Sequence, residues 1–480
     1  MSASVVRSFG WSFLEQSGSK AVTIVVQIVL ARLLAPEVFG VLAILLVVVS
    51  IADSVAQSGL GLALIQKENV CEASYDTAFW LSVAFAVVLY CIMLICSPAI
   101  ASFYGMPDMV SFLRVLGVTV IFNAVNSIQR ARLQKKLEFK PIFFASLLAV
   151  VVSGSTGIVC ACFGFGVWAL IAQSLIQAIC LCAAMGFFER WHPHFVFSIT
   201  EARDLFSFGW KVGVTGILNV FYIGLSELVV GKVCGARGLG YYSQGRKYPT
   251  AAIGVINNAV ANVLFPAFSA MAADFEKLRL AIARSLKLGT FITLPMALYF
   301  VSIAKPLIIL LLTETWLPCV FVFQFTCLSS AFTIMQLVNL RAYMALGDGS
   351  LYLRLQVEKV LFGVVVICGT AIATHDINAT AFSACVVSIL SVFIIDLRPA
   401  KRMLSYSCSR QLKDVSRTIL VALVSTAVSF VPQLIFVDSI LLLLSQSVIF
   451  IVCYCALSGL FCRLELRELR AVVNALIRNH

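Results

Sequence analysis

Long apolar stretches alternate with short polar stretches along nearly the whole of the 480-residue chain. A helix needs about 20 apolar residues to cross a bilayer core of roughly 30 Å, and stretches of this length recur from one end of the sequence to the other. Because a backbone exposed to lipid must satisfy its hydrogen bonds internally, we expect each stretch to form a helix. The pattern predicts an all-α integral membrane protein with about 14 transmembrane helices, at 12–34, 39–65, 77–99, 109–130, 142–163, 165–188, 205–230, 248–271, 285–312, 317–345, 354–374, 378–397, 417–437 and 439–462.

The composition supports this reading. Hydrophobic residues make up 61% of the chain and charged residues only 12%, whereas soluble domains carry about 25% charged residues. The connections are too short for a folded extramembrane domain, and the start of the chain does not read as a removable signal peptide.

The net charge of +12 is unevenly distributed among these connections. If the N-terminus lies in the cytoplasm, every second connection is cytoplasmic, and those connections hold most of the basic residues. This is the asymmetry that basic residues show in membrane proteins, so we expect both termini to be cytoplasmic. The predicted outer loop at 231–247, which contains Arg246 and Lys247, is an unusually basic exception.

The tetrapeptide SFGW occurs twice, at 8–11 and at 207–210. A shift of 199 residues lays the first predicted span on the seventh and aligns four polar positions that step by four, three and four residues, which is one face of a helix. The aligned pairs are Gln16 with Thr215, Lys20 with Asn219, Thr23 with Tyr222 and Gln27 with Ser226. Duplicated halves are typical of secondary transporters. We therefore expect a bundle of six spans at 1–200, a second bundle at 201–400, and two further helices with a basic tail at 401–480.

Several segments carry a resemblance to a known family. They are FGWSFLEQSGSKAVTIVVQIVLARLLAPEVFGV near the start, SGLGLALIQK after the second span, RARLQKKLEFK at 130–140, and GYYSQGRKYPT with the following LFPAFSAM. In these segments the chain resembles the polysaccharide-exporter flippases of the colanic-acid or O-antigen exporter type. This group belongs to the multidrug/oligosaccharidyl-lipid/polysaccharide (MOP) superfamily, which also includes multidrug and toxin extruders. The resemblance extends over nearly the whole chain.

The resemblance implies a fold and a task. In such proteins two six-helix bundles face each other across a central cavity, and alternating access moves an undecaprenyl-pyrophosphate-linked oligosaccharide to the outer leaflet. On this basis we expect a non-enzymatic flippase of the bacterial inner membrane that serves O-antigen, capsule or exopolysaccharide synthesis. Its partners would be the lipid-linked oligosaccharide, membrane lipids and a polysaccharide polymerase or chain-length machinery, and no nucleic acid.

Lys20 is the first candidate for substrate contact, because it lies in the middle of a predicted span. A lysine at the bilayer centre costs about 3 kcal/mol on insertion scales, so it normally faces a polar cavity. There it would suit the pyrophosphate that the family carries. Two alternatives stay open, an internal ion pair with Asp53 of the second span and simple snorkelling. Asp53 is itself a candidate for substrate contact or for protonation during coupling.

Neutral polar residues of the spans form a second set of candidates, because a hydroxyl-rich ligand needs many donors and acceptors. These are Gln16, Thr23, Gln27, Gln57, Asn219, Tyr222 and Asn258. Each is as well explained by a contact between helices. Two basic residues complete the predicted site: Lys211, which is also compatible with a place at the cytoplasmic interface, and Arg246, which would receive phosphate near the outer mouth or contact lipid headgroups. The basic segment 130–140 is best explained as a topology determinant that binds anionic headgroups.

The sequence contains no phosphate-binding loop of the type GxxxxGK[ST], so we expect no ATP hydrolysis and no cofactor. Energy would come from an ion gradient of H⁺ or Na⁺, from the membrane potential, or from downstream polymerisation. The main alternative is a multidrug or metabolite extruder of the same superfamily, which would favour a more apolar cavity. A membrane polymerase or ligase would be expected to hold a long catalytic outer loop.

Overall fold

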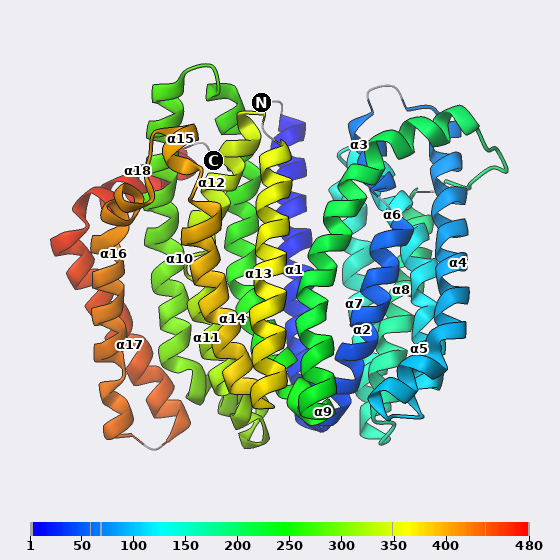
Figure 1. Ribbon diagram of the computed structural model, residues 1–480, viewed down its shortest axis with the longest axis horizontal. Helices are drawn as coiled ribbons and strands as arrows, with labels where there is room; N and C mark the ends of the chain where they lie inside the picture. Colours follow the sequence, from blue (N-terminus) through cyan, green and yellow to red (C-terminus); the bar gives the residue numbers. More distant parts are fainter. Residues whose placement is uncertain are drawn as a thin grey trace. The chain divides into compact units, whose positions relative to one another are not determined.

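The computed structural model is built of α-helices joined by short connections (Figure 1). It describes residues 3–57, 59–67, 70–189, 191–347, 349–436 and 438–478. Within these ranges, 12 helical segments are long and apolar enough to cross a membrane. The prediction of an all-helical membrane protein is confirmed, whereas the number of 14 spans stays a prediction.

The difference between the two numbers has an identifiable origin. Helix α1 (Ala3–Leu33) is not among the 12 candidate spans, and α9 (Ile199–Met271), in which two helices meet at a kink, is counted as one span where the sequence predicts two. The backbone of α9 leaves helical geometry at Gly235, with φ 72° and ψ 178°, which a residue with a side chain rarely adopts. The predicted outer loop at 231–247 is shorter in the structure, because two helices meet at Gly235 and Arg246 lies in the helical part that follows this kink.

The chain forms two compact units, residues 1–240 and 241–480. The predicted division at 200 and 400 stays a prediction. The first unit contains α1, α2 (Pro36–Gln57), α3 (Leu60–Gln66), α4 (Glu72–Tyr104), α5 (Met109–Gly117), α6 (Thr119–Lys135), α7 (Phe139–Cys162), α8 (Val167–Glu189) and the first part of α9. Helix α6 extends to Lys135, so the segment predicted as a loop from Arg130 begins inside a helix.

Glycines of α7 bring α1 and α8 close to this helix. A Cβ atom at Gly154 would lie 2.6 Å from Val26 of α1, and one at Gly157 would lie 3.1 Å from Gln173 of α8. Small residues allow membrane helices to pack at short backbone distances, where van der Waals contacts stabilise them. The close packing of α1, α7 and α8 positions the polar side chains described below.

At one end of the first unit, the start of α2 crosses the part of α9 that follows Gly235. A Cβ atom at Gly40 of α2 would lie 1.7 Å from the carbonyl oxygen of Ala236, and one at Gly240 would lie 2.0 Å from the carbonyl oxygen of Pro36. Each glycine therefore packs on a backbone carbonyl of the other stretch. The contact is reciprocal, and the paired positions differ by 200 residues, as expected for duplicated segments.

The second unit contains the rest of α9 and the remaining helices. They are α10 (Phe275–Leu312), α11 (Val320–Ser330), α12 (Thr333–Ala345), α13 (Gly349–Thr374), α14 (Ile377–Ser391), α15 (Ala400–Leu404), α16 (Cys408–Ser429), α17 (Ser439–Phe461) and α18 (Arg463–Arg478). Helices α10, α12 and α16 share a buried apolar core with the end of α9 and with the π-helical segment Val392–Asp396 that follows α14. In this core Asn339 and Gln411 exchange two hydrogen bonds of 2.9 and 3.0 Å.

Candidate binding cavity in the first unit

A cavity of about 400 Å³ lies among α1, α6, α7 and α8 of the first unit. Its lining residues are Ser19, Lys20, Thr23, Arg130, Ser146, Ala149, Val150, Gln177 and Leu181. Lys20 and Thr23 belong to the predicted polar stripe of the first span, so the structure brings part of that stripe to a cavity.

The charge of this cavity is of one sign. Lys20 and Arg130 are its charged residues, and none of the described residues that line it is acidic. Lys20 is exposed, although it lies in the interior of a 31-residue helix. An exposed ammonium group in a polar cavity avoids much of the desolvation that it would suffer in lipid. The cavity is therefore chemically suited to an anion.

Neutral donors and acceptors surround the two cations. The Thr23 hydroxyl donates a hydrogen bond of 2.8 Å to the carbonyl oxygen of Ser19. The Ser19 hydroxyl is buried and has no hydrogen-bond partner among the described residues, and Ser146 and Gln177 add a hydroxyl and an amide to the wall. A ligand that combines negative charge with hydroxyl groups fits this set of side chains.

Asp53 forms its hydrogen bond with a neutral residue of α6. The Asn123 side chain of α6 donates a hydrogen bond of 2.9 Å to Asp53 Oδ2, while Oδ1 is buried without a partner among the described residues. Within that part of the chain no ion pair joins Lys20 to Asp53. The alternative in which Lys20 serves only to neutralise Asp53 therefore has no support in this structure.

Gln27 lies two turns beyond Lys20 on α1 and contacts another helix. Its amide donates to the side-chain oxygen of Gln173 on α8 at 3.4 Å, and the residue is 8% exposed. This contact joins α1 to α8, which is the structural alternative stated for the polar residues of the spans.

The other predicted site residues do not line the cavity. Gln57 is half-buried at the end of α2, and Tyr222 is half-buried on α9. Arg246 belongs to the second unit, where its guanidinium lies 5.3 Å from the ring centroid of Tyr242. The side chains of Gln16, Lys211, Asn219 and Asn258 lie outside the part of the structure that is described.

The sequence does not indicate that Arg130, Ser146 and Gln177 belong to the binding cavity. The basic segment 130–140 predicts a lipid-binding loop that begins at Arg130, but Arg130 lies inside α6 and lines the cavity. A signal was present on α8, where Gln173 and Gln177 are separated by four residues and so share one face of an apolar helix. The side of the helix on which a cavity opens is not encoded in that spacing.

Charged residues gather at the end of the first unit where α6 and α8 end. The Glu189 carboxylate is 1% exposed, and its Oε1 lies 2.8 Å from Arg132 Nε and 2.9 Å from Lys136 Nζ. Arg132 also bonds Glu72 at 2.8 Å, and its guanidinium lies 4.8 Å from the ring centroid of Tyr75. We call Glu72, Arg132, Lys136 and Glu189 the ionic cluster.

A second ion pair lies near the ionic cluster and ties the start of α9 to the residue after α3. Lys67 Nζ lies 2.7 Å from Glu201 Oε2. This hydrogen bond raises the pKa of Lys67 above its usual value of 10.5, and it lowers the pKa of Glu201 below its usual value of 4.5. Both groups therefore stay charged over a wide pH range.

The described residues contain no group of three or more His, Cys, Asp or Glu side chains that is arranged to hold a metal ion. The side chains that line the cavity offer positive charge and hydrogen-bonding groups.

Comparison with known sequences adds a family to this geometry. A family model described as polysaccharide biosynthesis protein matches residues 29–321. The succinoglycan biosynthesis transport protein ExoT of Rhizobium meliloti is 26% identical over 65% of this chain and 63% of its own length. The lipopolysaccharide biosynthesis protein WzxC of Escherichia coli is 26% identical over 62% of this chain and 61% of its own length. The chain thus matches about three fifths of the length of these curated relatives.

Solved structures share the fold at low sequence identity. The lipid II flippase MurJ in an inward closed conformation superposes with a TM-score of 0.73 and 13% identity, over 95% of this chain and 99% of that protein. An inward-facing multidrug resistance transporter of the MATE family, in the MOP superfamily, gives a TM-score of 0.63 and 15% identity, over 81% of this chain and 95% of that protein. The fold is therefore shared with a lipid II flippase and with a multidrug resistance transporter.

Proposed function

Because this chain belongs to the family described as polysaccharide biosynthesis protein, we propose that it is the flippase for a lipid-linked oligosaccharide. Its cargo is an oligosaccharide on undecaprenyl pyrophosphate, carried across the bacterial inner membrane by alternating access. The product serves the synthesis of a surface polysaccharide.

The basic cavity of the first unit is the observation that supports this cargo most directly. It places Lys20 and Arg130 among hydroxyl and amide groups, without an acidic residue among its described lining. A pyrophosphate needs cationic donors, and the adjoining sugar needs neutral hydrogen-bonding groups. A site for a cationic drug would need the opposite charge.

Lys20 is the residue on which this assignment depends most. Its ammonium is a compact point charge that tolerates different phosphate geometries, whereas the guanidinium of Arg130 offers a planar fork. Ser19 and Thr23, on the same face of α1, bring hydroxyl groups beside that charge. Lys211, Asn219, Tyr222, Asn258 and Arg246 remain proposed contacts from the rest of the chain.

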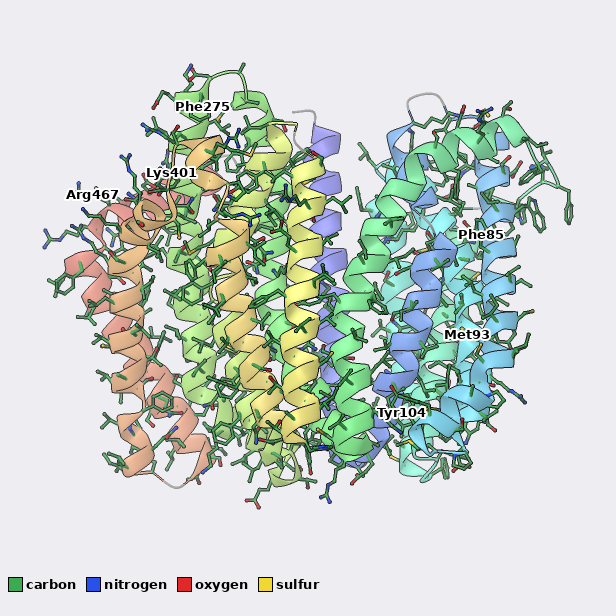
Figure 2. All side chains as sticks on the ribbon, viewed as in Figure 1. Phe85, Met93, Tyr104, Phe275, Lys401 and Arg467 are labelled. Carbon is green, nitrogen blue, oxygen red and sulfur yellow. The ribbon has the colours of Figure 1, made fainter. Side chains whose placement is uncertain are left out.

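The proposed orientation places both termini in the cytoplasm. In the second unit, Lys401 and Arg467 lie at the same end as Phe275, where α10 begins (Figure 2). In the first unit, the ionic cluster gathers at one end. Basic residues mark the cytoplasmic side of membrane proteins, so these ends would face the cytoplasm. Reporter fusions after residues 33, 271 and 478 would test the orientation.

The energy source and the partners are further parts of the proposal. Asp53, with one carboxylate oxygen bonded to Asn123 and the other without a partner among the described residues, is our candidate for a protonation site that couples transport to an ion gradient. A polysaccharide polymerase or the chain-length machinery would receive the cargo on the outer side.

The test is mass spectrometry of undecaprenyl-linked sugars in cells that lack this protein. We expect one lipid-linked repeat unit to accumulate, wild-type protein to clear it, and Lys20→Ala to clear it at least tenfold more slowly, because one of two cations is lost from the cavity. Lys20→Arg keeps the charge and should retain most of the activity. Gln57→Ala, at a position that does not line the cavity, is the matched control.

Two results would each contradict one part of the proposal, the first the flippase function and the second the role of the cavity. An unchanged pool of lipid-linked sugars, together with altered sensitivity to cationic drugs, would instead support an extruder. Normal clearance by Lys20→Ala would keep the flippase and remove the cavity from its cargo path.

A further inference from the structure

The segment that joins α8 to α9 has an unusual surface. Residues 191–198 are not helical, yet Phe195 is 90% exposed, Val196 48% and Phe197 54%. Ile199, the first residue of α9, is 79% exposed. An aqueous loop normally carries polar side chains, so this run of exposed apolar groups needs a partner that is itself apolar.

Both sides of this segment are fixed to the first unit by buried apolar residues. Trp191 is 9% exposed and Leu205 is 2% exposed, and both pack in one cluster with Leu60 and Leu64 of α3 and with Tyr75 of α4. The exposed residues between them therefore project from a held segment. Their exposure is not the result of a loose chain end.

The backbone of the segment is satisfied by polar side chains of α4. The amide of His194 donates to Asp76 at 3.1 Å, and the amide of Ser198 donates to Thr77 at 3.1 Å. The Trp80 indole donates to the carbonyl oxygen of His194 at 2.8 Å. The two acceptors on α4 are buried, since Asp76 and Thr77 are 2% and 0% exposed. Irregular backbone at membrane depth requires such internal partners.

The position along α4 gives the depth of the segment. Asp76 and Trp80 lie about 6 and 12 Å along the axis from Glu72, where α4 begins. With 33 residues, α4 is about 50 Å long, about 20 Å longer than a hydrocarbon core of roughly 30 Å, and a core centred on α4 would begin about 10 Å from Glu72. Figure 1 shows the connection from α8 to α9 running beside the start of α4. The segment therefore lies at the level of the lipid headgroups.

Neighbouring groups fit the same level. The Trp80 ring stacks on Phe195 with centroids 4.6 Å apart, and tryptophan is enriched at membrane–water interfaces. The ionic cluster and the pair of Lys67 with Glu201 lie at this end of the unit. This arrangement matches a bilayer interface, where charged groups face water and apolar groups face the acyl chains.

We propose that residues 191–199 form an interface anchor, in which Phe195, Val196 and Phe197 insert at the boundary between the headgroups and the acyl chains of the bilayer. The anchor holds the start of α9 at a fixed depth, because the Lys67–Glu201 pair and Leu205 fix the next residues to the same unit. The partner is lipid, and it is recognised by apolar contact and not by headgroup identity. The anchor does not depend on which cargo is transported.

The test uses the full chain in lipid nanodiscs. A ketone-bearing amino acid placed at position 195 or 197 takes a nitroxide label without reaction at the 16 cysteines. Power saturation of the nitroxide signal then compares access by oxygen, which concentrates in lipid, with access by a water-soluble nickel chelate. We expect the oxygen-to-nickel ratio to be several-fold higher at both positions than at Arg203, an exposed position on the first turns of α9.

A second measurement tests how the anchor is held. Trp80→Phe keeps an aromatic ring beside Phe195 but removes the hydrogen bond to His194, so the label at 195 should become more accessible to nickel while the label at 203 is unchanged. Nickel access at 195 and 197 equal to that at 203 would overturn the proposal. Exclusion of both reagents would also overturn it, because a protein surface and not lipid would then cover the segment. An unchanged profile in Trp80→Phe would overturn the assigned role of that bond.

Discussion

The two ends of the first unit are held together in opposite ways. At one end, the ionic cluster and the Lys67–Glu201 pair connect α3, α4, α6, α8 and α9 through long side chains. At the other end, α2 and α9 touch through backbone, with Gly40 on the carbonyl of Ala236 and Gly240 on the carbonyl of Pro36. The ion pair of Glu37 with Arg237 at this end is 3.2 Å long but largely exposed, at 46% and 65%.

The two kinds of contact differ in how well they tolerate a substitution. Long charged side chains can change rotamer and partner, so an ionic end tolerates substitution and responds to salt and pH. A backbone-to-backbone contact has no such freedom, because any side chain placed in it must push two helices apart. We therefore expect the glycine crossing to be sensitive to size and the ionic end to be sensitive to charge.

The largest effect is expected at the glycine crossing. In Gly40→Ala the new methyl group would lie 1.7 Å from a carbonyl oxygen, and we expect a loss of about 3 kcal/mol or more in the free energy of unfolding. Thermal unfolding of the purified protein measures it. The control is Gly216→Ala, where nothing lies within 4 Å of the new atom. Equal stability of the two variants would show that the crossing is not a tight contact.

A smaller effect is expected in the ionic cluster. Glu189→Gln leaves the mostly buried Arg132 with Glu72 as its remaining acidic partner in the cluster. Removing one member of a buried pair costs about 3–5 kcal/mol, but Arg132 keeps Glu72 and Lys136 is 44% exposed, so we expect about 2 kcal/mol. The same unfolding measurement serves, with Glu37→Gln at the glycine end as the control. A loss in Glu37→Gln equal to that in Glu189→Gln would contradict the proposed contrast.

The smallest effect is expected from the Lys67–Glu201 pair, which is partly solvated and should contribute less than about 1 kcal/mol. Because the pKa of Glu201 is lowered and that of Lys67 is raised, this contribution is fully present between the unfolded values of about 4.5 and 10.5. It is lost as pH falls through the lowered pKa of Glu201 or rises through the raised pKa of Lys67. We therefore expect the free energy of unfolding of Glu201→Gln to fall less steeply than that of wild type as the pH drops below about 4.5. If wild type and Glu201→Gln lost the same stability as the pH falls, the Lys67–Glu201 pair would not contribute to the acid dependence of unfolding.

Much of the fold could be predicted from the sequence, because lipid as a solvent leaves few options. Apolar stretches of sufficient length must become helices, and the structure confirms an all-helical membrane protein. The connection expected at 231–247 is shorter in the structure, where two helices meet at Gly235 and the basic residues Arg246 and Lys247 lie in the helical part that follows. Basic residues do not by themselves indicate a loop, because a membrane helix can carry polar residues wherever protein or a cavity surrounds them.

The candidate site could be predicted only in part. Lys20 was recognised because an unexplained cation in an apolar span demands a polar environment, and Thr23 followed from its place on the same face. Arg130 was not recognised, because its neighbours in sequence form a basic segment that has a sufficient explanation of its own. Its role in the cavity depends on α6 continuing past the predicted end of the span and on α7 bringing α1 and α8 close.

The sequence by itself determined the solvent, the helical secondary structure and the family, since each of these follows from local composition or from a pattern along the chain, and the duplication of the two halves stays a prediction. Only the tertiary structure decided which polar residues meet: Lys20 with Arg130 at one cavity, Asp53 with Asn123, and Gln27 with Gln173. The physical reason is that a polar residue on an apolar helix has to find a partner or a cavity, and several partners are equally compatible with its position in the sequence. The rotation and spacing of the helices, fixed by small residues such as Gly154 and Gly157, select one partner among them.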